Sequence, residues 1–90
     1  MFRMWCKEIK DNHLLRDMVV EDSSADSRTT KVFNGLRTAC ETFDLSVPIW
    51  LDVNINEFRR IARARFTQDS FIEQIPFDFL EIKVIEEDFM

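Results

Sequence analysis

Residues 2–21 read FRMWCKEIKDNHLLRDMVVE, two strand-like runs on either side of a short polar segment. Residues 2–9 and 14–21 mix apolar and charged side chains in the manner of half-buried β-strands. Residues 10–13, Lys-Asp-Asn-His, favour a turn between them, because asparagine and aspartate tolerate left-handed backbone geometry. The stretch therefore predicts an antiparallel β-hairpin.

A further strand is predicted near the end of the sequence. Residues 77–86 alternate between apolar and polar side chains, and acidic residues 86–88 close the run. We expect this strand to join the hairpin in a three-stranded antiparallel sheet. Even-numbered apolar residues of the three strands share one face, which we expect helices to cover. These residues are Phe2, Met4, Cys6, Met18, Val20, Leu80, Ile82 and Val84.

Two helices are predicted between the hairpin and the last strand. Residues 26–43 carry one apolar stripe at helical spacing, and we expect its members Phe33, Leu36 and Phe43 to face the core. Gly35 lies inside this helix, where glycine costs about 1 kcal/mol relative to alanine. A glycine at such a position indicates that another element passes close to the helix.

The second helix is predicted over residues 54–65. Asn54 and Glu57 have the spacing of a capping box at its start, and apolar residues at helical spacing follow them. Outside this helix, residues 47–51 are expected to be extended, and residues 71–75 are expected to form one helical turn.

Together these elements predict an α+β fold of order ββααβ, in which the three-stranded sheet packs against both helices. The chain has 90 residues, one glycine and two prolines, which leaves little room for linkers. We therefore expect residues 1–90 to form a single compact domain.

Composition narrows the classes of function. The net charge of −5 argues against general binding to nucleic acid or anionic membranes, because both need a basic surface. No run approaches the roughly 20 apolar residues of a membrane span, and the first eight residues do not resemble a signal peptide. We expect a cytoplasmic protein with no membrane contact. Cys6 and Cys40 are far apart in sequence, and we expect them to be reduced thiols in the core.

Few residues in the sequence could carry catalysis. The only histidine, His13, falls in the predicted hairpin turn, and a chain with a single glycine has no Gly-rich phosphate loop. Asp52, Asp69 and Asp78 are scattered over the sequence, which is poor evidence for a metal site. We therefore expect no catalytic residue, no metal site and no cofactor.

The densest positive charge in the chain is the run RRIARAR, which holds Arg59, Arg60, Arg63 and Arg65. In a helical projection the first three arginines form a basic strip on one flank of the second helix. Arg65 falls on the apolar side of that helix. Either the helix ends before Arg65 or its guanidinium turns inward to a carboxylate.

Three kinds of anion could neutralise these arginines. The first is an internal network, with Asp52 or Asp69 bonded to Arg65 and with Glu73 or residues 86–88 facing the strip. The second is an acidic segment of a protein partner. The third is a phosphate or nucleic acid, which the overall acidity of the chain disfavours.

Odd-numbered residues of the three strands are also rich in apolar side chains. Two helices can cover only one face of such a sheet, and soluble monomers rarely leave large apolar patches exposed. We therefore expect a homo-oligomer, most simply a two-fold dimer, that buries the second face. The interface is predicted to contain Trp5, Val19, Phe79 and Ile85.

Four short runs resemble a family of small uncharacterised bacterial proteins. These runs are Phe43-Asp44-Leu45-Ser46, Pro48-Ile49-Trp50-Leu51-Asp52, Arg65-Phe66-Thr67-Gln68-Asp69 and Val84-Ile85-Glu86-Glu87-Asp88. The resemblance covers almost the whole chain. It implies a bacterial source and no particular activity, cofactor or catalytic residue.

The sequence therefore favours a non-enzymatic protein that interacts with other proteins or with copies of itself. The alternative is a small regulatory protein that binds nucleic acid or phosphate through Arg59, Arg60 and Arg63. The two hypotheses differ in their response to salt. Phosphate contacts release counterions, whereas burial of an apolar face is nearly insensitive to salt.

Overall fold

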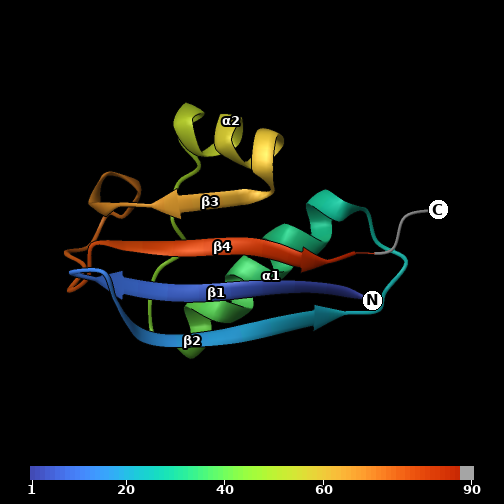
Figure 1. Ribbon diagram of the computed structural model, residues 1–90, viewed down its shortest axis with the longest axis horizontal. Coiled ribbons are helices and arrows are strands. Elements are labelled where there is room, and N and C mark those ends of the chain that lie inside the picture. The colour runs from blue at the N-terminus through green and yellow to red at the C-terminus, as the bar shows by residue number, and fades with distance from the viewer. Residues whose placement is uncertain (88–90) are drawn as a thin grey trace.

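The computed structural model describes residues 1–87, which form an α+β fold with two helices and a four-stranded antiparallel sheet. The strands run in the order β2-β1-β4-β3 across the sheet (Figure 1). The strands are β1 (Phe2–Lys10), β2 (His13–Asp22), β3 (Arg63–Phe66) and β4 (Phe79–Glu86). The helices are α1 (Arg28–Thr42) and α2 (Asp52–Ile61), and the 3-10 turn is η1 (Gln68–Ser70).

The predicted α+β class is confirmed, but the predicted three-stranded sheet is wrong. A fourth strand, β3, pairs with β4 along the outer edge of the sheet, from Arg63 opposite Lys83 to Phe66 opposite Leu80. The element order is therefore ββααββ. The second helix was expected to continue through these residues, and it ends instead at Ile61, because Ala62 adopts a left-handed conformation with φ 55°.

The hairpin is confirmed, with a turn of only two residues between β1 and β2. Asp11 and Asn12 have φ values of 51° and 65°, the left-handed geometry that short hairpin turns require. The carboxylate of Asp78 accepts a hydrogen bond from the backbone N–H of Asp11 at 2.8 Å. The turn is thereby fastened to the segment that enters β4.

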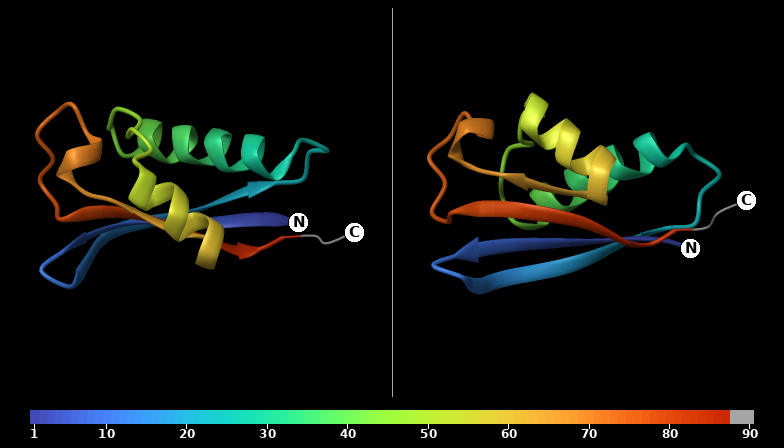
Figure 2. Two further views of the ribbon diagram at one scale, coloured as in Figure 1. Left: turned by 90° about the horizontal axis from the view of Figure 1, so that it is seen from above. Right: turned by 45° about the horizontal axis from the view of Figure 1, so that its top comes forward.

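Helix α1 covers one face of the sheet (Figure 2). Its first turn is capped by Ser27, whose side chain accepts a hydrogen bond from the backbone N–H of Thr30 at 3.2 Å. A Cβ atom placed on Gly35 would lie 2.9 Å from Cε of Met4 and 3.4 Å from Cγ1 of Val20. The predicted close approach at Gly35 is therefore confirmed, and the approaching elements are β1 and β2.

The core lies between α1 and the even-numbered face of the sheet. The eight even-numbered strand residues predicted for this face are all buried or packed against the core. Leu36 and Phe43 also face the core as predicted. Phe33 does not, since 51% of its surface is exposed and Val32 occupies the buried position beside it.

Helix α2 lies beyond the outer edge of β3, not on the sheet face (Figure 1). Buried Asn54 joins the two elements, because its Nδ2 donates to the backbone carbonyl of Arg65 at 2.8 Å. Its Oδ1 accepts the backbone N–H of Leu51 at 3.0 Å and the hydroxyl of Ser70 at 3.4 Å. Asn54 was expected to begin the helix, but it is the third residue of a helix that begins at Asp52.

The segments that precede and follow α2 and β3 agree only in part with the structure expected from the sequence. Residues 47–51 form neither helix nor strand, and Leu51 has the extended backbone that was expected there, with φ −88° and ψ 163°. The N–H of Ile49 donates to the carbonyl of Ser70 at 2.7 Å. The helical turn expected at residues 71–75 is absent from the described chain. The 3-10 turn η1 precedes that segment, and the side chain of Gln68 holds the loop through the backbone of Glu73 and Ile75 at 2.6 and 2.9 Å.

Candidate functional site

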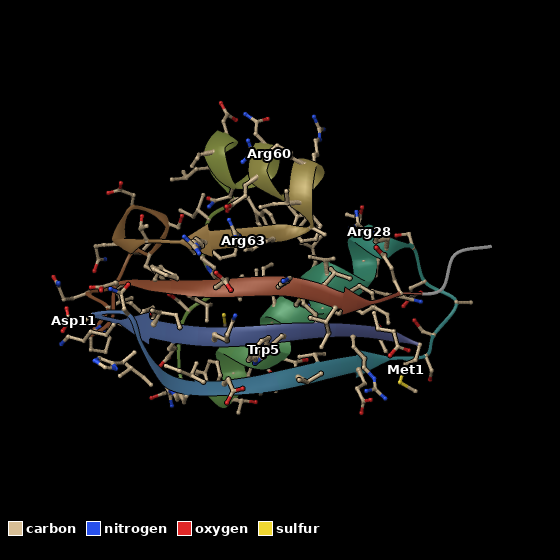
Figure 3. All side chains as sticks on the ribbon, viewed as in Figure 1. Met1, Trp5, Asp11, Arg28, Arg60 and Arg63 are labelled. Atoms are coloured by element: carbon tan, nitrogen blue, oxygen red, sulfur yellow. The ribbon has the colours of Figure 1, made fainter. Side chains whose placement is uncertain are left out.

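The sheet face that α1 leaves uncovered, hereafter the open face, brings together most of the predicted site residues. Helix α1 lies behind the sheet in Figure 1, so the open face looks toward the viewer. The register places Trp5 of β1 between Val19 of β2 and Lys83 of β4. Lys83 in turn lies opposite Arg63 of β3. Trp5 and Arg63 are labelled in Figure 3.

An ion-pair cluster occupies the middle of the open face. The register aligns Lys7, Glu81 and Arg65 on three neighbouring strands. The Glu81 side chain is only 7% exposed, and its carboxylate lies 2.7 Å from Nζ of Lys7 and 2.8 Å from Nε of Arg65. Burial acts to raise the pKa of Glu81, but hydrogen bonds from the two cations outweigh it and hold that pKa below its ordinary value.

Two aromatic rings flank this cluster, and each is in contact with one of its cations. The Lys7 ammonium lies 3.9 Å from the centre of the Trp5 ring, and the Arg65 guanidinium lies 5.0 Å from the centre of the Phe79 ring. The indole N–H of Trp5 donates to Asp17 at 2.7 Å. The open face is thus an ordered set of charged and aromatic side chains.

The predicted basic strip on one helix flank is wrong. Arg59 and Arg60 lie in the last turn of α2, where their charge is favourable to the helix dipole, but Arg63 and Arg65 lie on β3. Arg63 pairs with Glu57 at 2.9 Å. Within residues 1–87, Arg59 and Arg60 are exposed and form no ion pair.

The internal partners proposed for the arginines are also different. Arg65 binds Glu81, not Asp52 or Asp69. Glu73 accepts hydrogen bonds from the backbone and hydroxyl of Ser46, and Glu86 pairs with Arg3 at 3.6 Å. Glu87 pairs with Arg28 at 2.9 Å. Asp88, the last acidic residue named for this role, lies outside the described residues.

Three of the four predicted interface residues, Trp5, Val19 and Phe79, share the open face. The fourth, Ile85, is 47% exposed and falls at a bulge, where the β1–β4 register passes from Arg3 opposite Glu86 to Met4 opposite Val84. The face is not the continuous apolar surface that the odd-numbered pattern suggested, because charged residues separate the apolar ones.

Sequence reasoning missed Lys7, Glu81 and Lys83 as members of this site. Their signal was present in the alternation of the strands, which places Lys7 and Trp5 on one face of β1 and Glu81 and Lys83 on one face of β4. Without the strand order, however, nothing in the sequence aligns Lys7 with Glu81. The acidic member was therefore absent from the predicted site.

The remaining chemistry-bearing side chains do not gather at one place. Buried Cys6 and Cys40 are free thiols, as predicted. Burial raises the pKa of each to about 12, with a further contribution to Cys6 from Cys40, so both stay protonated. Exposed His13 begins β2. Within residues 1–87 no three His, Cys, Asp or Glu side chains are placed to hold a metal ion.

Neither helix in the described part of the chain is long and apolar enough to cross a membrane. Comparisons of the chain with protein-family models, curated proteins and solved structures gave no match. The resemblance to a small bacterial family therefore stays a prediction.

Proposed function

We propose that the protein is a non-enzymatic interaction module that associates with a second copy of itself through the open face. The observation that carries this proposal is that the fold covers one sheet face with α1 and leaves Trp5, Val19 and Phe79 on the other. Tryptophan and arginine are the side chains that most often dominate binding energy at protein interfaces. The open face presents Trp5 on β1 and Arg63 and Arg65 on β3, with β4 between them.

The distribution of charge on the open face supports a two-fold arrangement. The β2 edge of the face contributes Asp17 and Glu21, whereas the β3 edge contributes Arg63 and Arg65. A two-fold axis parallel to the strands lays β2 of one copy over β3 of the other, so opposite charges meet on both sides of the axis. The same arrangement lays Trp5 of each copy over β4 of its partner.

The oligomeric state of a Trp5→Glu variant tests the proposal. We expect the wild-type chain to have twice its monomer mass of 10.8 kDa in light scattering at tens of micromolar, and the variant to have the monomer mass. Thr38→Glu, on the exposed side of α1, adds the same charge away from the open face and should remain dimeric. A wild-type protein of monomer mass at this concentration rules out self-association.

A second candidate function is binding of nucleic acid, since the open face also combines Lys7, Lys83 and Arg63 with the rings of Trp5 and Phe79. Single-stranded nucleic acids bind surfaces that pair cations with aromatic stacking platforms. Titration of a fluorescent single-stranded RNA distinguishes the two functions. If the protein binds RNA through three phosphate contacts, the logarithm of the association constant should fall with the logarithm of the salt concentration with a slope of about −2 to −3. If it is only a self-associating module, no RNA binding is expected.

A further inference from the structure

A cleft of about 390 Å³ lies between α1 and α2, away from the open face. Its apolar walls include Val32, Phe33, Trp50 and Phe58, and the side chains of Arg28 and Arg59 also line it. Pockets for small molecules commonly have volumes of 300–1,000 Å³ and combine apolar walls with a few polar groups. We refer to this feature as the α1–α2 cleft.

The aromatic walls of the α1–α2 cleft are fixed by contact with one another. Trp50 packs edge to face against Phe33, Phe58 and Phe66, with ring centres 5.9, 5.7 and 5.0 Å apart. Phe66 is fully buried and belongs to the core, whereas Phe33 is half exposed. The cluster therefore runs from the core to the surface and ends in an exposed ring, which core packing alone does not require.

Of the two arginines that line the cleft, only one has a carboxylate partner in the described part of the chain. Arg28 is held in place by Glu87 at 2.9 Å and by the Phe58 ring, whose centre lies 5.1 Å from its guanidinium. Arg59 has no ion pair within residues 1–87. The helix dipole favours both Arg59 and Arg60 in the last turn of α2, but only Arg59 lines the cleft.

We propose that the α1–α2 cleft binds a small amphipathic carboxylate, with its apolar body against Phe33, Trp50 and Phe58 and its carboxylate on Arg59. A guanidinium beside apolar walls favours this chemistry, because it offers a charge-assisted hydrogen bond that a neutral ligand of the same shape cannot make. The site is separate from the open face, and its occupancy does not depend on self-association.

Two ligands with the same apolar body test the role of charge. The probes are 1-naphthylacetate and 2-(1-naphthyl)ethanol, which carry a carboxylate and a hydroxyl on the same ring system. Calorimetric titration of the full chain should show the carboxylate binding at least about tenfold more tightly than the alcohol. In NMR spectra the indole N–H signal of Trp50 should move on titration, and that of Trp5 should not.

Adjacent arginines provide matched variants. Arg59→Gln should abolish the preference for the carboxylate and leave the affinity for the alcohol unchanged. Arg60→Gln removes the same charge outside the α1–α2 cleft and should preserve the preference for the carboxylate. The proposal is overturned by equal affinities for the two probes, by an equal loss in both variants, by an unmoved Trp50 signal, or by no binding at millimolar concentration.

Discussion

Glu81 shows how the environment of a single residue links the open face to stability. Its lowered pKa means that the folded state favours the carboxylate more than the unfolded state does. The resulting stabilisation is complete above the ordinary glutamate pKa of about 4.3 and is lost as the pH falls through the lower pKa of the folded state. Glu81 therefore contributes stability at neutral pH that disappears in acid.

Replacing Glu81 with glutamine should reveal this contribution. We expect Glu81→Gln to lower the free energy of unfolding at pH 7 by about 1–3 kcal/mol, because Lys7 and Arg65 lose a shared charged partner. Denaturant titrations between pH 7 and pH 3 should show the difference from wild type shrinking below about pH 4. Glu41→Gln, an exposed control on α1, should change stability by less than about 0.5 kcal/mol at any pH.

Gly35 tests the packing between α1 and the hairpin. In Gly35→Ala, the better helix propensity of alanine should stabilise the fold by about 1 kcal/mol, and displacement of the flexible end of Met4 should destabilise it by a similar amount. The free energy of unfolding should therefore change by less than about 1 kcal/mol. Leucine cannot be accommodated in this way, and Gly35→Leu should cost at least about 2 kcal/mol. If urea denaturation shows that Gly35→Ala stabilises the fold by the whole gain in helix propensity, Gly35 is not in close contact with Met4.

Some residue positions were predictable from the sequence because alternation determines them. Once β1 and β4 are recognised, every second residue must face the core, which explains why Met4, Cys6, Leu80 and Ile82 were placed correctly. Phe33 was misplaced because it lies beside the apolar stripe of α1, and a helical stripe is too broad to separate it from Val32. The contact of Phe33 with Trp50 could not be predicted from the helix sequence, because Trp50 lies on a separate segment of the chain.

At the scale of elements, β3 marks the limit of sequence reasoning. The apolar residues Ile55, Phe58, Ile61, Ala62 and Phe66 keep a helical spacing through the boundary between α2 and β3. Helix α2 ends at Ile61 and is followed by Ala62 in the left-handed region, a position where glycine is the usual signal. The four-residue alternation of β3 is too short to outweigh the helical pattern.

Asn54 should control whether α2 stays attached to the edge of the sheet. Its removal in Asn54→Ala leaves the N–H of Leu51 and the carbonyl of Arg65 without their partners, so we expect a loss of about 2–3 kcal/mol. Hydrogen exchange should accelerate in α2 and β3 more than in β1 and β2. Asn56→Ala, on the exposed side of the same helix, serves as the control and should have little effect. Uniform acceleration across the sheet argues against this local role.

At the scale of the whole molecule, a two-layer fold in which α1 covers one sheet face follows from the sequence, but the character of the other face does not. The apolar residues at odd positions are real, yet strand order decides which charged residues separate them. By adding β3 at the edge, the fold brings Arg63 and Arg65 onto the open face and leaves Asp17 and Glu21 at the opposite edge. This separation of charge determines the orientation we propose for the dimer.

Opposite charges introduced at Val19 should therefore have different effects on self-association. Val19 is 45% exposed on β2, which the proposed two-fold axis places over β3 of the second copy. Val19→Lys should weaken the dimer by at least about tenfold more than Val19→Glu, because lysine faces Arg63 and Arg65 whereas glutamate faces opposite charge. The difference, measured by sedimentation at 50 mM salt, should shrink at 500 mM, where the Debye length is only a few ångströms. Equal weakening by both variants leaves burial of the side chain as the only contribution and rules out this orientation of the two copies.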